Sequence, residues 1–120
     1  MTGFIVFAHG SRIESANQAV RDVAARMAAS GNHVVEPAFL ELGTPDLAGA
    51  AQRLRHKGAS RIIVIPYFLT LGTHLQRDLP KLAQDAARSL GADIEIELTA
   101  PLDGHPALLE ALLDRASQAL

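Results

Sequence analysis

Four short apolar runs alternate along the chain with four amphipathic segments, and this alternation constrains the fold more than any other feature. The runs are rich in Val, Ile and Phe and end at turn residues, as strands do; they span residues 3–8, 33–40, 61–68 and 93–98. The other segments repeat apolar residues at helical spacing; they span residues 14–29, 45–57, 79–90 and 106–116. Because alternating strands and helices join through right-handed crossovers, the sequence predicts an α/β fold with a parallel four-stranded sheet.

The composition of the runs predicts the order of the strands. The runs at 3–8 and 61–68 are apolar throughout, as expected of central strands that are buried on both faces. The run at 33–40 contains Glu36 and Pro37, and the run at 93–98 alternates polar and apolar residues, so both belong at edges. The simplest order is therefore 2-1-3-4, with helices on both faces in a three-layer sandwich. Ligands of such sheets bind at the carboxyl ends of the strands where the chain reverses, here after the first and third strands.

Turn residues predict where the helices begin. We expect Thr44 to cap the second helix, with Pro45 as its first residue. We expect Asp78 to cap the third, which puts Pro80 in its first turn and leaves residues 69–75 as a loop. The apolar stripe expected for the first helix consists of Ala16, Val20, Val23 and Met27, widened by Ala19 and Ala24.

Length and composition exclude several classes of protein. A chain of 120 residues allows one domain, residues 1–120. The absence of Cys excludes disulfide scaffolds and thiolate metal sites, so any metal must be bound by His, Asp or Glu. A net charge of −2 gives no reason to expect binding to nucleic acid or to a membrane surface. Since no apolar stretch approaches a membrane span and no signal peptide precedes the first run, we expect a cytoplasmic protein.

Three residues that can bind a metal follow three successive strands of the predicted sheet. His9 follows the first strand, Glu41 the second, and His74 lies in the loop after the third. Each alone is more often a surface residue, but parallel strands place all three at one carboxyl edge, where they favour a functional site. Two imidazoles and a carboxylate suit Fe, Co, Ni or Zn and suit Mg or Ca poorly.

The remaining histidines differ in their expected positions. His33 begins the second strand at the opposite end of the sheet, and His56 lies on the polar side of the second helix, so both are interpreted as solvated surface residues. His105 precedes Pro106 at the carboxyl edge, where it either caps the last helix or lines the site.

Other residues near the two site histidines can contact a ligand. Gly10 and Gly72 allow close approach of the backbone, although either can be an ordinary turn glycine. Arg12 and Arg77 can bind carboxylates in a bidentate manner, although solvated Arg is commoner on loops. Ser11 suggests a hydrolase, but the G-x-S-x-G elbow is absent, and so are the G-x-G-x-x-G and P-loop motifs of nucleotide-binding folds.

Together these motifs resemble those of a known family across nearly the whole chain, namely the short CbiX-type sirohydrochlorin chelatases. The matching segments are residues 7–12 (F-A-H-G-S-R), 38–41 (A-F-L-E), 66–69 (P-Y-F-L), 72–80 (G-T-H-L-Q-R-D-L-P) and 101–106 (P-L-D-G-H-P). The H-G-S-R start followed at this separation by G-x-H-x-x-x-D-x-P is a specific signature.

The resemblance implies a chelatase-like domain that inserts cobalt, nickel or iron as the divalent ion into sirohydrochlorin, for cobalamin, sirohaem or the nickel coenzyme of methanogenesis. No organic cofactor is expected. It also implies that His9 and His74 are catalytic, that Glu41 contacts the metal, and that Gly10, Ser11, Arg12, Gly72, Arg77 and His105 are candidates for substrate binding. Larger relatives contain two such domains, so the chain resembles half of a bilobal chelatase and is expected to form a homodimer. The alternative is a tetrapyrrole or metal carrier without turnover.

Overall fold

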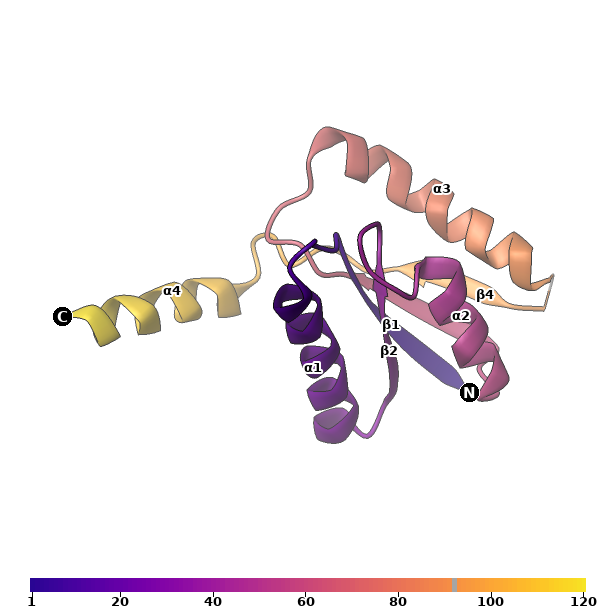
Figure 1. Cartoon of the computed structure of the whole chain (residues 1–120), viewed down its shortest axis with the longest axis horizontal. Coiled ribbons are helices and arrows are strands. Elements are labelled where there is room, and N and C mark those ends of the chain that lie inside the picture. Colours follow the sequence, from indigo (N-terminus) through magenta and orange to yellow (C-terminus); the bar gives the residue numbers. More distant parts are fainter. Residues whose placement is uncertain (92) are drawn as a thin grey trace.

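The computed structural model describes residues 1–91 and 93–120. Strands and helices alternate as the sequence predicts (Figure 1). The elements are β1 (Thr2–Ala8), α1 (Glu14–Gly31), β2 (Val34–Phe39), α2 (Leu47–His56), β3 (Arg61–Pro66), α3 (Thr73–Leu90), β4 (Glu95–Leu98) and α4 (Pro106–Ala119).

The strands form one parallel sheet in the order β2-β1-β3-β4, which confirms the predicted order and the α/β class. The register pairs Ala8 with Phe39 and Phe7 with Pro66, so the carboxyl ends of β1, β2 and β3 lie side by side. The loops that follow these three strands therefore begin at the same edge of the sheet.

Helices cover the two faces of the sheet unequally (Figure 1). On one face α2 and α3 pack over a core that includes Ile5 and Phe7 of β1. On the other face α1 packs over Val6 and Ala8, the alternate residues of the same strand. The result is a three-layer arrangement in which the β3–β4 half of the α1 face has less cover, since Ile63 of β3 is only half-buried there.

The last helix extends away from the rest of the molecule (Figure 1). Every residue of α4 is exposed except the half-buried Leu108, although Leu109, Leu112 and Leu113 are apolar. The radius of gyration is 15.0 Å, whereas a compact domain of this length has about 13.6 Å. Leu109, Leu112 and Leu113 therefore do not cover the sheet within one chain.

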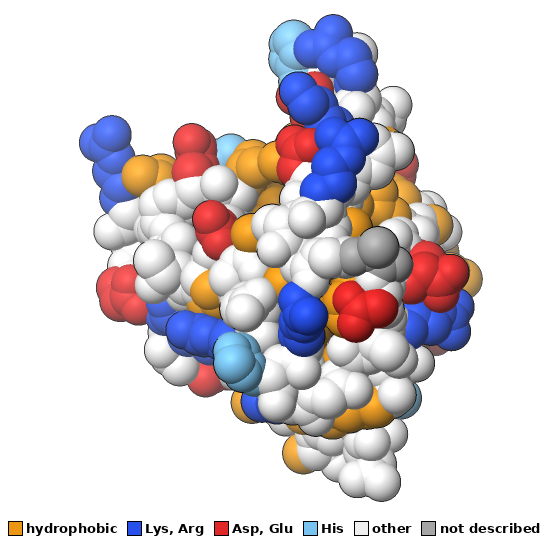
Figure 2. Space-filling model, turned by 90° about the vertical axis from the view of Figure 1, so that its right-hand side faces the viewer, with side chains coloured by type: hydrophobic (Ala, Val, Ile, Leu, Met, Phe, Trp, Pro, Cys, Tyr) orange, Lys and Arg blue, Asp and Glu red, His pale blue; other side chains and the backbone are white. Residues whose placement is uncertain are grey.

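Figure 2 shows the side of the molecule that lies to the right in Figure 1, away from α4. Lys and Arg side chains are interspersed there with Asp and Glu, so this side carries a mixed charge. No helix within residues 1–91 and 93–120 has the length and hydropathy of a membrane span.

Two helices begin at residues other than those expected. In α2 the cap is Asp46, whose carboxylate accepts a hydrogen bond from the Gly49 N–H at 2.8 Å. Thr44 and Pro45 therefore precede the helix. In α3 the cap is Gly72 and the helix begins at Thr73, so Pro80 lies within it instead of in its first turn. As a consequence His74 lies in the first turn of a helix and not in a loop.

The buried face of α1 also differs from the expected stripe. Its buried residues are Asn17, Val20 and Ala24, whereas Ala16 and Val23 are exposed. Relative to the expected stripe, the buried face of α1 is shifted so that it includes the polar residue Asn17. Asn17 can be buried because its side chain forms hydrogen bonds with backbone groups of the neighbouring loops.

Candidate active site

Two loops are joined at the carboxyl edge of the sheet by backbone hydrogen bonds that continue the β1–β2 pairing. The Leu40 N–H donates to the Ala8 carbonyl at 2.9 Å, and the Glu41 N–H donates to the His9 carbonyl at 3.0 Å. His9 and Glu41 are thus held opposite each other although both lie beyond the ends of their strands. The predicted placement of these two residues at one edge is confirmed.

Gly10 makes this close approach of the loops possible. Its φ is +92°, a value that favours glycine. A Cβ at this position would lie 1.7 Å from the Glu41 carbonyl oxygen, so no side chain fits without moving the loop that carries Glu41. The glycine of the H-G-S-R segment is therefore a structural requirement for the pairing of His9 with Glu41.

The His9 and Glu41 side chains form a pair of donor atoms for a cation. Nδ1 of His9 lies 3.2 Å from the Gly10 carbonyl, which can only accept, so the neutral ring carries its proton on Nδ1. The lone pair of Nε2 is then free, and Nε2 lies 3.4 Å from Oε1 of Glu41. Two ligand atoms at about 2.0–2.2 Å from one tetrahedral ion lie about 3.3–3.6 Å apart. Because about half of each side chain is exposed, an ion from solvent can reach them.

His74 is paired with an arginine of its own helix. Nη2 of Arg77 lies 3.1 Å from Nδ1 of His74, and since a guanidinium only donates, Nδ1 accepts this bond. A neutral His74 therefore carries its proton on Nε2. Coordination of a metal through Nδ1 requires Arg77 to move, and coordination through Nε2 requires the proton to leave. His74 and Arg77 thus meet as neighbours on α3, and both are exposed.

The three predicted metal ligands do not form one cluster within a single copy of the chain. Among the residues that the structure describes, no group of three His, Asp or Glu side chains is placed to bind an ion together. The His9–Glu41 pair is assembled, and His74 lies apart from it on α3. A site that uses all three residues stays a prediction.

The other candidate residues lie in the β1–α1 loop or at the N-terminal caps of two helices. Ser11 and Arg12 follow Gly10 in the β1–α1 loop, and the Ser11 Oγ accepts a hydrogen bond from the Ile13 N–H at 3.0 Å. Gly72 caps α3, with open space around it. His105 caps α4, because its Nδ1 accepts a hydrogen bond from the Ala107 N–H at 3.0 Å, so the cap interpretation of this residue is confirmed.

The two remaining histidines lie away from this edge, as predicted. His33 directly precedes β2 at the opposite end of the sheet and packs against Phe4, with 4.8 Å between ring centroids. His56 is the last residue of α2 and is exposed.

Sequence reasoning missed Asn17, the one buried polar residue in the described part of the chain, which is 2% exposed. Its side chain bonds to backbone groups of both site loops. The signal in the sequence was its position one turn before Val20 on the buried face of α1. An Asn on such a face needs hydrogen-bond partners, and the two loops are the nearest source.

An apolar hollow lies between the loop after β3 and the start of α4. Tyr67, Phe68 and Leu69 line it from the loop, and Leu102 and Leu108 line it from the other side. The Tyr67 N–H donates to the Phe7 carbonyl at 2.7 Å, so this wall begins at the same sheet edge as His9.

Comparisons with known proteins identify relatives of this chain. A chloroplastic sirohydrochlorin ferrochelatase from Arabidopsis thaliana is 36% identical over 119 residues, which cover 98% of this chain and 52% of that protein. A sirohydrochlorin cobaltochelatase from Saccharolobus solfataricus is 32% identical over 126 residues, covering 98% of this chain and 95% of that protein.

A solved structure has the same fold. The sirohydrochlorin chelatase SirB from Bacillus subtilis subspecies spizizenii, in complex with cobalt, superposes with a TM-score of 0.87 at 26% identity, over 98% of this chain and 50% of that one. The chain thus spans about half the length of SirB and of the plant protein. The model of the CbiX family matches residues 3–119, and with relatives of this identity and coverage the chain belongs to the CbiX family.

Proposed function

We propose that this chain is a sirohydrochlorin chelatase, which inserts a divalent metal ion into the tetrapyrrole with release of two protons. The observation that carries the proposal is the His9–Glu41 pair, in which a free imidazole lone pair faces a carboxylate at 3.4 Å. Relatives that carry the names sirohydrochlorin cobaltochelatase and ferrochelatase support the substrate.

The proposed chemistry needs groups that bind an ion weakly and accept protons. Sirohydrochlorin loses two pyrrole N–H protons while the ion loses its water ligands and forms bonds to four ring nitrogens. His9 Nε2 and Glu41 first hold the hydrated ion, and the carboxylate offsets part of its charge. As the ion moves to the ring nitrogens, the vacated imidazole and carboxylate become free to accept the protons. His74 is proposed as the second catalytic histidine, with its Nδ1 made available when Arg77 turns to the substrate.

Two features of the surface suit the tetrapyrrole. Its macrocycle is flat and largely apolar, and the hollow lined by Tyr67 and Phe68 gives it a wall at the sheet edge. Its peripheral carboxylates suit the guanidinium groups of Arg12 and Arg77, both exposed on that edge. Gly10, Ser11, Gly72 and His105 are proposed to border the substrate from the loops that carry them.

The active form is proposed to be a homodimer in which each copy supplies one half of the site, as the two halves of a bilobal chelatase do. Residues 1–120 form one such half. The exposed leucines of α4 and the half-buried Ile63 on the less covered sheet face supply the apolar surface for the contact. A second copy also supplies another His74, which supports a complete metal site between the subunits.

Cobalt, nickel and iron remain the candidate ions, and no organic cofactor is needed for the step. SirB structures contain cobalt in one case and Fe³⁺ in another, and the curated relatives are named for cobalt or for iron, so both metals have support. His and Glu ligands accept all of these ions, so supply in the cell decides among them. A cytoplasmic location without nucleic-acid or membrane partners also stays a prediction.

The test is a spectroscopic insertion assay. Purified protein is mixed with sirohydrochlorin and Co²⁺, and the visible spectrum of the macrocycle is followed against a control without protein. The proposal expects insertion faster than the control. A protein that binds sirohydrochlorin or Co²⁺ without accelerating insertion would instead be the carrier without turnover.

A further inference from the structure

We infer that Asn17 is a positioning residue, which sets the distance between His9 and Glu41 by holding both of their loops from the buried face of α1. The inference deepens the proposed function and rests on it for its catalytic consequence. Its structural basis is independent of the substrate, since it concerns only the side chains and loops of one chain.

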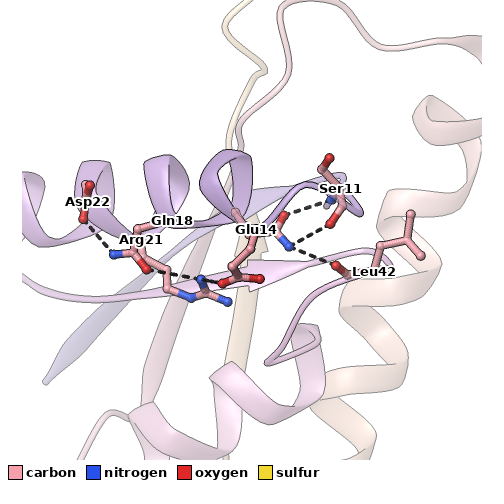
Figure 3. A network of polar contacts seen from close by, with 7 residues as sticks. Ser11, Glu14, Gln18, Arg21, Asp22 and Leu42 are labelled. Carbon is pink, nitrogen blue, oxygen red and sulfur yellow. Dashed lines mark hydrogen bonds and ion pairs between the residues drawn. The ribbon is translucent and has the colours of Figure 1, made fainter.

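The contacts of Asn17 reach the two loops directly. Its Oδ1 accepts a hydrogen bond from the Ser11 N–H at 2.9 Å, and its Nδ2 donates to the Ser11 carbonyl at 2.9 Å. The same Nδ2 donates to the Leu42 carbonyl, also at 2.9 Å. In Figure 3 the dashed lines from Ser11 and from Leu42 converge between the two loops. Both N–H groups and the oxygen of the Asn17 carboxamide therefore form hydrogen bonds with backbone groups of the two loops.

The positions of these contacts tie Asn17 to the metal-binding pair. Ser11 follows His9 by two residues, and Leu42 directly follows Glu41. Leu42 has a φ of +58°, so the β2–α2 loop turns sharply as soon as Glu41 has passed the sheet edge. Because the Leu42 carbonyl is fixed at this turn by Asn17, the side chain of Glu41 is held toward His9.

The carboxamide of asparagine meets all the hydrogen-bonding requirements of this position. The site demands one acceptor for the Ser11 N–H and two donors for the carbonyls, within a space that leaves the side chain 2% exposed. Asp keeps the acceptor but turns an oxygen toward the Leu42 carbonyl. Ala leaves all three backbone groups without this partner. The two variants therefore release the Glu41 loop in different ways.

The experiment compares Asn17→Ala and Asn17→Asp with Val20→Ala. Val20 lies one turn further along the same buried face of α1 and packs with Val6 and Phe39 of the strands. Its apolar side chain cannot hydrogen-bond to either site loop, so it controls for loss of core packing. Three quantities are measured on folded protein: the Kd for Co²⁺ alone, by visible absorption, and the KM for Co²⁺ and the kcat of insertion into sirohydrochlorin. Replacement of a residue that orients a metal ligand typically weakens metal binding by about 10- to 100-fold.

We expect both Asn17 variants to bind Co²⁺ at least about 10-fold more weakly than the wild type and to raise KM for Co²⁺ by a similar factor. Val20→Ala removes methyl groups from the core and no polar contact of the site loops, so its Kd for Co²⁺ is expected to stay close to that of the wild type. If Asn17 acts through Glu41, then Asn17→Ala combined with Glu41→Ala binds Co²⁺ no more weakly than Glu41→Ala alone.

Several outcomes would overturn the inference. The first is that the Asn17 variants bind Co²⁺ as tightly as Val20→Ala does. The second is that the double variant loses Co²⁺ affinity by the product of the factors lost in Asn17→Ala and Glu41→Ala. The third is that the wild type does not bind Co²⁺. A wild type that binds Co²⁺ through Asn17-dependent geometry but does not insert it would instead overturn the proposed function and leave the inference standing.

Discussion

At the scale of single residues, the structure makes Gly10 the position least able to accept a side chain. Gly10→Ala brings a Cβ against the Glu41 carbonyl and forces a φ of +92° on an alanine. We expect it to lower the free energy of unfolding by about 1–3 kcal/mol, measured by urea denaturation. Gly72→Ala is the matched control, because its φ is −68° and the space around it is open. A loss at Gly72 equal to that at Gly10 would contradict the close-approach argument.

The histidines allow a second prediction at this scale. His9→Ala and His74→Ala should each reduce the rate of metal insertion by about 100-fold or more, because each removes a group proposed to bind the ion or accept a proton. His33→Ala and His56→Ala, which lie away from the site edge, should leave the rate near that of the wild type. Equal impairment of His33→Ala and His74→Ala would show that the site lies elsewhere.

Single residues also show how far the sequence alone can predict the site. His9 and Glu41 could be placed together because the carboxyl ends of adjacent parallel strands lie at one edge of the sheet, as the observed pairing of β1 with β2 shows. Asn17 was missed, because a polar residue on a helix is expected to face solvent. Its burial depends on loop carbonyls whose positions no helical periodicity encodes.

At the scale of elements, an ion pair joins β3 to β4 and gives a prediction for pH. The Arg61 guanidinium donates to both carboxylate oxygens of Glu97, at 3.1 and 2.9 Å, and this hydrogen bonding lowers the pKa of Glu97 from its ordinary 4.5. A lowered carboxyl pKa stabilises the folded state above the ordinary value, and the contribution is lost as pH falls through the lowered pKa.

Glu97→Gln should therefore be slightly less stable than the wild type at neutral pH, with the difference vanishing once the pH is below the lowered pKa of Glu97. Thermal unfolding of both proteins across this range measures it. Glu95→Gln, on the same exposed face of β4, is the control, since Glu95 contributes only a weaker charge effect at Arg61. A difference that grows on acidification would contradict the assigned sign.

Elements also differ in how well their ends could be predicted. The strand order followed from composition, because central strands are apolar on both faces and edge strands are not. The start of α3 was predicted too late, since Pro80 is most often found in a first turn, whereas here the helix begins at Thr73. The residues before Pro80 are mostly exposed, so they carry little of the apolar periodicity that would have revealed the first two turns.

At the scale of the whole molecule, one chain is an incomplete α/β sandwich. The α1 face is covered over β1 and β2, and its β3–β4 half has less cover. The helix that follows β4 in sequence points away from the sheet (Figure 1). The segment that forms α4 contains four leucines, at positions 108, 109, 112 and 113, but periodicity cannot tell whether a helix covers its own sheet or that of a neighbour. The elongated shape of the molecule could therefore not be predicted from the sequence.

This shape leads to the prediction on assembly. We expect light scattering at micromolar concentration to give a mass about twice the 12.8 kDa of one chain, because Leu109, Leu112 and Leu113 are each 59–69% exposed in one copy and such patches mark contact surfaces. Replacing the three leucines with Gln should give a folded monomer, since within a single chain they are mostly in contact with water.

The same variant tests whether the dimer builds the site. If ligands from two copies enclose the macrocycle, the triple Gln variant should lose metal insertion while its circular dichroism stays that of the folded protein. Gln118→Ala is the control on α4, because the Gln118 side chain bonds to Arg115 and Asp114 of its own helix. That variant should remain a dimer and keep its rate. A monomer that inserts metal at the full rate would contradict the shared site, and the His9–Glu41 pair of one copy would then be sufficient for the reaction.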